Sequence, residues 1–327
     1  QLQSSAASDV YKRQQLQPVQ SLAVELLGHS LLLTRDRDGL VRCFRNRCPH
    51  RGVELLPADG TVRSCRKLVC PYHGWTYNLE GELLAAARED GFVPPLQRAD
   101  WPLEALLTQE DGPLIWVALG DTPFPLPEQL KLIHGHALSS WQAPMQQHAT
   151  SSLSLQCNWK VAHDNTLDDY HVAIAHPTTL HREQGPVRDY RHLMADLGNA
   201  LVTPHPEGGL FFTFGLAPWT HVLIWPDGRI ALLEFLPLQL DCCQLKLRLF
   251  ASSAQPLDVE IWKQQLLEFL QEDRRLIESV QRGSHTDWAP GPAHQLEQRI
   301  VQWQQLYRRL LDAAQLSHSS RSQIAIN

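Results

Sequence analysis

Two short segments of the chain each place a cysteine close to a histidine. Cys48 and His50 form the first pair, and Cys70 and His73 form the second. Thiolate and imidazole groups both bind metals, and two of each could complete a tetrahedral zinc site. Zinc fingers usually take both cysteines from one half of the motif and both histidines from the other, whereas here each half supplies one of each. The mixed pairing therefore disfavours a zinc finger.

A Rieske [2Fe–2S] cluster fits this division of ligands, because one of its irons is held by two cysteines and the other by two histidines. Neutral imidazoles in place of two thiolates lower the negative charge of the cluster and so raise its reduction potential. A proline follows each cysteine, and Gly52 and Gly74 end the two segments. These residues suit tight loops whose backbone N–H groups can reach the cluster sulfurs. Structural zinc and four unrelated core residues are the alternatives.

A second group of possible metal ligands lies in residues 158–177. Asp168 is three residues before His171, so the two side chains would share one face of a helix. His171 and His176 would be separated by about 140° of rotation on a regular helix. They can therefore converge on one ion only if the helix widens or ends there, and Pro177 favours an ending.

A mononuclear site needs a third ligand, and a later helical segment offers carboxylates. Asp273 is the candidate that we select, with Glu272 and Glu278 close to it in the sequence. Two histidines and one carboxylate form a facial triad that leaves three positions open on Fe(II). His163 could compete as a ligand, but its spacing from the other two histidines is poor.

The first part of the chain consists of short apolar runs that are separated by turn residues, as in a small antiparallel β domain. We expect strands over residues 31–33, 40–44, 68–70, 75–77 and 113–118. Asp38 and Gly39 predict a hairpin turn between the first two. We assign this domain to residues 15–125, since Pro123, Pro125 and Pro127 predict a linker or domain edge there.

The second part, residues 126–327, combines helices and strands, so the predicted class of the chain is α+β. A helix is expected over residues 161–175, and apolar residues at helical spacing predict two more. Strands are expected over residues 210–214, 221–225, 230–236 and 245–251, and the two later helices over residues 258–280 and 295–314.

The bulk composition excludes some classes of protein. The chain has 327 residues, of which 43% are hydrophobic and 20% charged, as in ordinary globular proteins. Its net charge of −6 gives no basic footprint for nucleic acid or an anionic membrane surface. No apolar run approaches the roughly 20 residues of a membrane-spanning helix. Residues 1–14 lack an initiator Met and any periodicity, and we expect a disordered remnant of cloning or sequence assembly.

The seven cysteines are an odd number, which argues against a disulfide scaffold and for a reducing cytoplasm. Cys43 and Cys65 each precede a ligand cysteine by five residues. They could form a disulfide, but we prefer the interpretation that both are small core residues on the strands that enter the loops.

With both groups of donors in view, the chain from Val24 to Ala314 resembles the catalytic alpha subunits of the Rieske non-heme iron oxygenases. The motifs that begin at Asn158, Asp168 and Glu272 are similar to those of carnitine, choline and glycine-betaine monooxygenases, and ring-hydroxylating dioxygenases share much of the pattern. The resemblance implies a Rieske β domain followed by a helix-grip (START-like) catalytic domain.

The resemblance also implies ligand sets for the two metal centres. The cluster ligands would be Cys48, His50, Cys70 and His73, and the Fe(II) ligands would be His171, His176 and Asp273. Asp168 matches a carboxylate that, in this family, bridges the cluster of one subunit and the iron of the next within a homotrimer. It would accept hydrogen bonds from His171 and from the partner subunit's His73.

The function implied is hydroxylation or demethylation of a small organic substrate, either a quaternary ammonium compound or an aromatic, with O₂. Electrons would come from an NAD(P)H-dependent flavin/iron–sulfur reductase or a ferredoxin. The alternative is a Rieske electron carrier with a non-catalytic second domain. A quaternary ammonium substrate would favour an aromatic cage. Candidate cage residues, which are more often core residues, are Phe211, Phe212, Phe214, Trp219 and Trp225.

Overall fold

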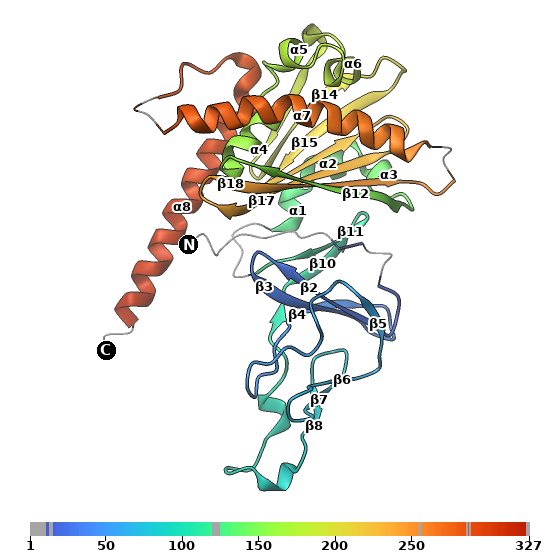
Figure 1. Cartoon of the computed structure of the whole chain (residues 1–327), viewed down its shortest axis with the longest axis vertical. Helices are drawn as coiled ribbons and strands as arrows, with labels where there is room; N and C mark the ends of the chain where they lie inside the picture. The colour runs from blue at the N-terminus through green and yellow to red at the C-terminus, as the bar shows by residue number, and fades with distance from the viewer. Residues whose placement is uncertain are drawn as a thin grey trace. The chain divides into compact units, whose positions relative to one another are not determined.

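The computed structural model describes residues 11–12, 16–119, 125–254, 257–285, 287 and 289–324, with backbone only for 11–12 and 313–324. The chain divides into two compact units, one ending at Asp121 and one beginning at Thr122 (Figure 1). We predicted a boundary between residues 125 and 126. Residues 120–124, which include Pro123, lie outside the described part, so this position stays a prediction.

The first unit is built from three small antiparallel sheets. Their strand orders are β5-β2-β3-β4-β9, β6-β7-β8 and β1-β11-β10. The strands are β1 (Tyr11–Lys12), β2 (Gln20–Leu26), β3 (His29–Arg35), β4 (Val41–Arg45), β5 (Val62–Ser64), β6 (Leu68–Val69), β7 (Thr76–Tyr77), β8 (Leu83–Ala85), β9 (Ala105–Leu106), β10 (Thr108–Asp111) and β11 (Leu114–Val117). Two short 3-10 helices are η1 (Glu89–Gly91) and η2 (Arg98–Asp100).

The predicted hairpin in the first unit is confirmed. β3 pairs with β4, and the turn between them is closed by a hydrogen bond from the N–H of Asp36 to the carbonyl of Leu40. Gly39 has φ 88°, a left-handed conformation that glycine adopts without strain. The expectation that residues 1–14 are disordered is wrong for Tyr11–Lys12, which pairs with β11. Residues 1–10 and 13–14 lie outside the described part.

The second unit contains one antiparallel sheet of seven strands, in the order β12-β18-β17-β16-β15-β14-β13. The strands are β12 (Gln146–Leu155), β13 (Arg191–Ala195), β14 (Gly198–Pro204), β15 (Leu210–Leu216), β16 (Thr220–Ile224), β17 (Ile230–Gln239) and β18 (Cys242–Ala251). The four predicted strands correspond to β15–β18, whereas β12, β13 and β14 were not predicted. β12 was missed because it alternates exposed and half-buried polar residues rather than apolar ones.

Helices pack on this sheet, with α4 and α7 on one face (Figure 1). The helices are α1 (Leu126–Gln129), α2 (Lys131–His136), α3 (Leu138–Trp141), α4 (Trp159–Leu167), α5 (Val172–Ala175), α6 (Leu180–Gln184), α7 (Val259–Gly283) and α8 (Gln298–Ile324), with 3-10 turns η3 (Val187–Asp189) and η4 (Gln295–Glu297). The two long helices α7 and α8 were predicted. The α+β class, an all-β first domain followed by an antiparallel sheet with long helices, is therefore confirmed.

The single helix predicted over residues 161–175 is wrong. The chain instead forms α4, leaves the helical conformation at Asp168 with φ −87° and ψ 95°, and forms the short helix α5 from Val172. α5 ends at Ala175, before Pro177, as the proline predicted. No helix in the described part of the chain has both the length and the apolar character needed to cross a bilayer.

Candidate metal centres

The first cysteine–histidine segment forms a tight loop after β4. The N–H of Cys48 donates to the carbonyl of Val53 at 2.7 Å, and the N–H of Gly52 donates back to the carbonyl of Cys48 at 2.8 Å. Gly52 has φ 77°, which a residue with a Cβ adopts only with strain. These bonds fix the loop that presents the first pair of ligands.

The second segment, between β6 and β7, repeats this construction. The N–H of Cys70 donates to the carbonyl of Trp75 at 2.8 Å, and the N–H of Gly74 donates to the carbonyl of Cys70 at 3.0 Å. Gly74 has φ 69°. Two loops of different sequence thus have the same backbone hydrogen bonds, and each offers one thiol and one imidazole.

The side chains of the two loops meet. The ring centroids of His50 and His73 are 4.6 Å apart, and Cys48 and Cys70 are both buried in the core of this unit. Among the described residues, Nδ1 of His50 is buried without a hydrogen-bond partner. The phenol of Tyr77 lies 3.6 Å from the sulfur of Cys48. A buried imidazole nitrogen without a partner beside buried thiols fits a metal cluster.

The spacing of the donors argues against a single zinc ion at this place. Ligand atoms around one tetrahedral zinc at about 2.0–2.3 Å lie within about 4 Å of each other. In the described part of the chain, the donors that do lie this close form a different group, in the second unit. Their ligand atoms are within 4.8 Å of one another. A two-iron cluster does not require such convergence, because its cysteines and histidines bind different irons.

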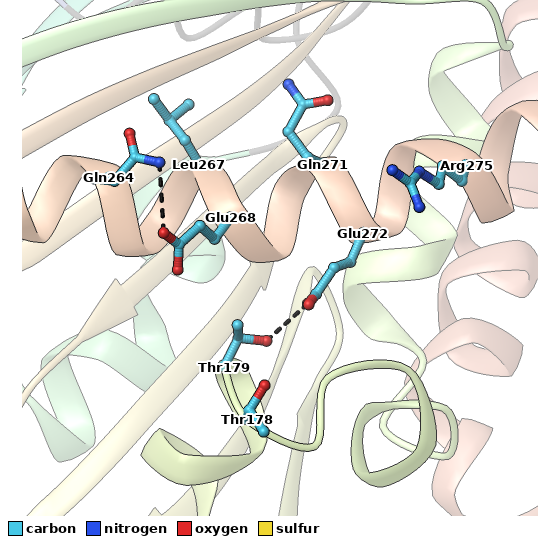
Figure 2. Close-up of a pocket in the computed structure, with 8 residues that line it drawn as sticks. All are labelled: Thr178, Thr179, Gln264, Leu267, Glu268, Gln271, Glu272 and Arg275. Carbon is cyan, nitrogen blue, oxygen red and sulfur yellow. Dashed lines mark hydrogen bonds between the residues drawn. The ribbon is translucent and has the colours of Figure 1, made fainter.

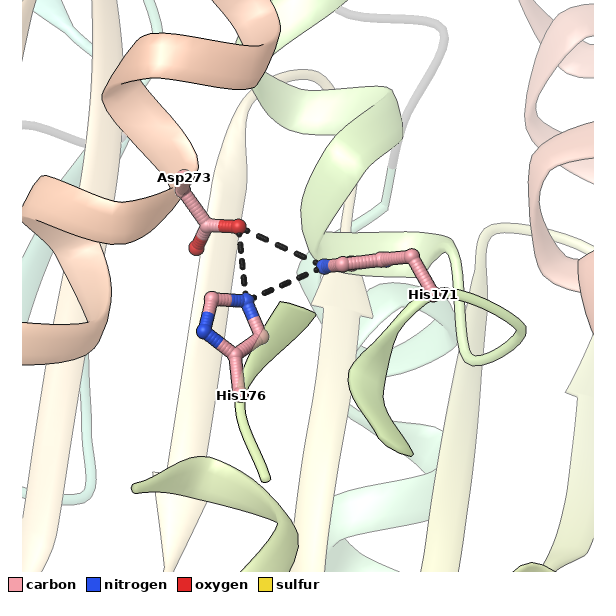
Figure 3. Close-up of side chains that lie close together, drawn as sticks. All are labelled: His171, His176 and Asp273. Carbon is pink, nitrogen blue, oxygen red and sulfur yellow. Dashed lines mark hydrogen bonds and ion pairs between the residues drawn. The ribbon is translucent and has the colours of Figure 1, made fainter. Parts of the chain in front are cut away.

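That other group consists of His171, His176 and Asp273 (Figure 3). Nε2 of His176 lies 3.2 Å from Nε2 of His171 and 2.9 Å from Oδ1 of Asp273. The remaining separation, from Nε2 of His171 to Oδ1 of Asp273, is 3.3 Å. Three ligands at neighbouring positions of an octahedral ion, each about 2.1 Å from it, would be about 3.0 Å apart. The three atoms therefore have the spacing of a facial triad.

A side-chain hydrogen bond accompanies the end of α4, just before the two histidines. Oδ1 of Asp168 accepts hydrogen bonds from the N–H groups of Tyr170, at 2.9 Å, and His171, at 3.2 Å. Such Asx contacts offer the backbone an alternative to the helix, so α4 stops and a turn follows. His171 then precedes α5 and His176 follows it, where the backbone leaves the helical conformation with φ −125° and ψ 45°.

Asp273 is the carboxylate of α7 that points to the histidines. Its Oδ1 also accepts a hydrogen bond from Nδ2 of Asn165, at 2.7 Å. Glu278, one of the alternatives, instead accepts hydrogen bonds from the N–H of Gln156 and from Arg274. The structure thus brings together the three residues that the sequence selected, and Asn165 is an additional contact that the sequence did not identify.

Glu272, the other alternative, contacts the site from outside. The Nδ1–H of His176 donates to Oε2 of Glu272 at 2.7 Å, and the hydroxyl of Thr179 donates to the same oxygen at 2.7 Å. Figure 2 shows both Glu272 and Thr179 on the wall of a surface groove along α7, which also includes Glu268 one turn away. Because Glu272 engages Nδ1, Nε2 of His176 faces the ligand atoms of His171 and Asp273.

The charges of the triad follow from its contacts. Burial lowers the pKa of His171, but Asp168 and Asp273 outweigh burial and raise it to about 10. Burial likewise lowers the pKa of His176, and Asp273 and Glu272 raise it overall. Burial raises the pKa of Asp273, and the two imidazoles lower it below its ordinary value. A site that attracts protons so strongly attracts a cation, which would bind the neutral imidazoles in competition with protons.

Asp168 lies next to this site. Nδ1 of His171 is 3.6 Å from Oδ1 of Asp168, which is a charge contact rather than a hydrogen bond. Among the described residues, Oδ2 of Asp168 has no hydrogen-bond partner. His163 does not join the site: its Nε2 faces the carbonyl of Thr220 at 3.4 Å, and burial lowers its pKa to about 3.

A cavity adjoins the triad on the inner side of the sheet. It is lined by Asn165, Thr166, Asp168, Asp169, His171, Val172, Leu180, Gln184, Thr213, His221, Leu223, Leu233, Phe269 and Asp273. None of the five aromatic residues considered for a cage lines it. Phe212 and Phe214 stack on each other at 5.5 Å on the opposite face of the sheet, since strand residues alternate and Thr213 lines the cavity.

All seven cysteines are free thiols. Cys43 is buried in β4, as expected for a core residue, and the sulfur of Cys65 lies 2.9 Å from the hydroxyl of Ser21. The disulfide that was considered between Cys43 and Cys65 is therefore not formed.

Two family models match the chain. A Rieske [2Fe-2S] domain matches residues 7–95, and the catalytic domain of the ring hydroxylating alpha subunit matches residues 143–212. The carnitine monooxygenase oxygenase subunit of Escherichia coli strain K12 is 27% identical over 278 residues, covering 79% of this chain and 72% of the relative. The glycine betaine monooxygenase oxygenase subunit of Chromohalobacter salexigens is 31% identical over 160 residues, covering 49% and 35%.

Solved structures agree with the fold. A quaternary ammonium Rieske monooxygenase, whose structure is described as giving insights into carnitine oxidation and inter-subunit electron transfer, has a TM-score of 0.78 at 21% identity. That match covers 94% of this chain and 89% of the other. Naphthalene 1,2-dioxygenase has a TM-score of 0.68 at 16% identity, covering 87% and 77%.

Proposed function

We propose that this chain is the oxygenase component of a Rieske non-heme iron oxygenase. In this proposal it hydroxylates or demethylates a small organic substrate with O₂ and electrons from a separate reductase. The observation that carries this proposal is the triad of His171, His176 and Asp273, with ligand-atom separations of 2.9–3.3 Å. An electron carrier would need the cluster loops but no second donor set. The triad therefore favours the oxygenase over the carrier.

In this proposal Cys48, His50, Cys70 and His73 hold the [2Fe–2S] cluster, and the triad holds Fe(II). The iron, when bound, supplies the oxidative chemistry with O₂. The residues of the chain bind and orient. Glu272 holds His176 by its Nδ1–H, and the amide of Asn165 holds Oδ1 of Asp273. Such outer contacts fix the orientation of metal ligands.

We further propose that Asp168 links the two centres between neighbouring subunits of a homotrimer. Its Oδ1 is engaged by backbone N–H groups, whereas Oδ2 has no partner among the described residues and could accept a hydrogen bond from His73 of the partner subunit. The inter-subunit electron transfer named for the quaternary ammonium monooxygenase supports this assembly. The reductase would be an NAD(P)H-dependent flavin/iron–sulfur protein or a ferredoxin, and the free thiols fit a cytoplasmic location.

For the substrate we propose a quaternary ammonium compound or an aromatic, the two classes that the named relatives represent. Phe269 is the aromatic hydrocarbon ring on the cavity wall, so a multi-ring cage like those that bind quaternary ammonium groups is not a feature of the described cavity.

Iron content and oxygen uptake together test the proposed function. The protein is purified with its cluster intact, and its iron is measured per chain. The oxygenase requires the two irons of the cluster and one more, whereas the carrier requires only the two. A panel of quaternary ammonium and aromatic compounds is then tested with a surrogate reductase for substrate-coupled O₂ consumption. A chain with two irons and no coupled uptake would be the carrier.

A further inference from the structure

The inner face of the sheet forms one wall of the cavity beside the triad. His221 on β16 pairs with Leu233 on β17, and Leu223 pairs with Ala231, so these side chains point to the same face. Thr213 on β15 pairs with Leu223 and therefore shares that face. We call these strand residues, Thr213, His221, Leu223 and Leu233, the cavity floor.

His221 is the unusual member of the cavity floor. His221 is only 4% exposed, yet neither of its ring nitrogens has a hydrogen-bond partner among the described residues. Its Nδ1 is buried from solvent. Burial and the nearby positive charge of Arg299 keep the pKa of His221 well below its ordinary value. The ring is therefore neutral and carries one N–H donor. Burying an unpaired polar group is unfavourable, so a native unpaired ring at a cavity wall needs an explanation.

Two neighbours of His221 on the same cavity also have donors to offer. The hydroxyl of Tyr190 donates to Oε1 of Gln184 at 2.9 Å, which engages the acceptor of the amide and leaves its NH₂ group. The guanidinium of Arg299 donates to Oγ1 of Thr213 at 3.0 Å, which leaves the hydroxyl proton of Thr213. The wall around His221 thus offers donors from Gln184 and Thr213 whose acceptors are already engaged, while the carboxylates of Asp168, Asp169 and Asp273 also line the cavity.

The buried positive charge next to the cavity floor also favours an oxygen acceptor in the cavity. Arg299 is fully buried, and its guanidinium contacts Asp169 at 3.1 Å as well as Thr213. Asp169 offsets much of this charge, and it also accepts a hydrogen bond from His192. A positive group beneath neutral donors favours an electron-rich oxygen above them.

We propose that His221, together with Gln184 and Thr213, binds an oxygen acceptor of the substrate, a carboxylate or a carbonyl, and so selects substrates that carry one. This inference deepens the proposed function and rests on it, since the cavity is the one beside the triad. His163, another buried histidine with an unpaired nitrogen, carries no such role because it does not line the cavity.

The test measures binding without turnover, so that it does not depend on catalysis. Dissociation constants are measured by calorimetry on the metal-loaded protein without reductase, for two matched pairs of probes. One pair is γ-butyrobetaine and an alkyltrimethylammonium ion of equal length, and the other is benzoate and toluene. The readout is the ratio of dissociation constants within a pair. The wild-type protein should prefer the carboxylate in at least one pair.

His221→Leu should reduce that preference by roughly tenfold or more, since a site built to bind a polar group discriminates against its absence. His221→Gln, which restores an N–H donor, should retain part of it. Gln184→Glu keeps the acceptor for Tyr190 but removes the NH₂ group, and it should also reduce the preference. If His221→Leu does not fold, the change of preference in Gln184→Glu tests the proposal. A purely structural His221 would change both members of a pair equally.

Three outcomes would overturn the inference: a preference that is unchanged in His221→Leu and Gln184→Glu, a wild-type preference for the probes without oxygen, or binding of neither pair. Failure of the proposed function looks different. In that case the probes would bind with the expected ratios, but the protein would lack the third iron and substrate-coupled O₂ uptake. Conversely, coupled uptake with an unchanged ratio would reject only the role of His221.

Discussion

Glu272 and His176 are joined by a hydrogen bond of 2.7 Å between Oε2 and Nδ1–H. His176 is fully buried, and this contact fixes which of its nitrogens carries the proton. The carboxylate of Glu272 thus contacts the imidazole of His176 through the nitrogen that does not face the other triad residues. Glu272 also lines the groove along α7.

Replacing Glu272 with glutamine should weaken Fe(II) binding by roughly 10- to 100-fold, because outer contacts of this kind tune metal ligands. Iron retained after dialysis against a graded chelator measures the change. Glu268→Gln is the matched control, since Glu268 lies one turn earlier on α7 and, among the described residues, accepts a hydrogen bond from Gln264 alone, at 3.4 Å. Equal iron retention in the two variants would contradict the role of Glu272.

His171→Ala should remove the mononuclear iron and substrate-dependent turnover while the visible absorption of the cluster persists, because the two ligand sets lie in separate units. Iron per chain should fall by one. His148→Ala, an exposed histidine on β12, is the control and should change neither quantity. Loss of the cluster spectrum in His171→Ala would reject the assignment of two separate sites.

Asp168→Asn should keep both metal centres but slow electron transfer between them. The asparagine oxygen can still accept the backbone N–H groups of Tyr170 and His171, so the turn should persist. What is lost is the charge that would engage the partner subunit. Reoxidation of the reduced cluster in a single turnover measures the rate, with the exposed Asp241→Asn as a control. An unchanged rate would reject the bridging role.

Asp164 should make the protein less stable as the pH rises. Burial raises the pKa of Asp164 to about 7. The folded state therefore binds a proton that the unfolded state releases near pH 4, and the stability due to that proton is fully present below this pH and lost as the pH rises through about 7. Asp164→Asn should match the wild type near pH 4 and exceed its stability by roughly 1–3 kcal/mol at pH 8. Urea unfolding at both pH values measures this, and a difference that does not vary with pH would contradict it.

The sequence predicted what local chemistry determines. The cluster loops follow from cysteine, proline and glycine at fixed positions, and the β3–β4 hairpin follows from Asp38 and Gly39. The break after α4 was missed because it depends on a side chain, Asp168, that competes with the helix. Asn165 was missed because its contact with Asp273 joins positions that are 108 residues apart. Such partners are set by the packing of α4 against α7, which no local pattern reveals.

The cavity beside the triad draws its walls from two kinds of element. Two of the three triad residues flank α5 and the third lies on α7, whereas the cavity floor belongs to β15, β16 and β17. A substitution at position 213, 221, 223 or 233 therefore changes what the cavity accepts and leaves the metal-binding residues in place. Substrate range and metal chemistry are in this way encoded by different segments, so one can diverge in evolution while the other is kept.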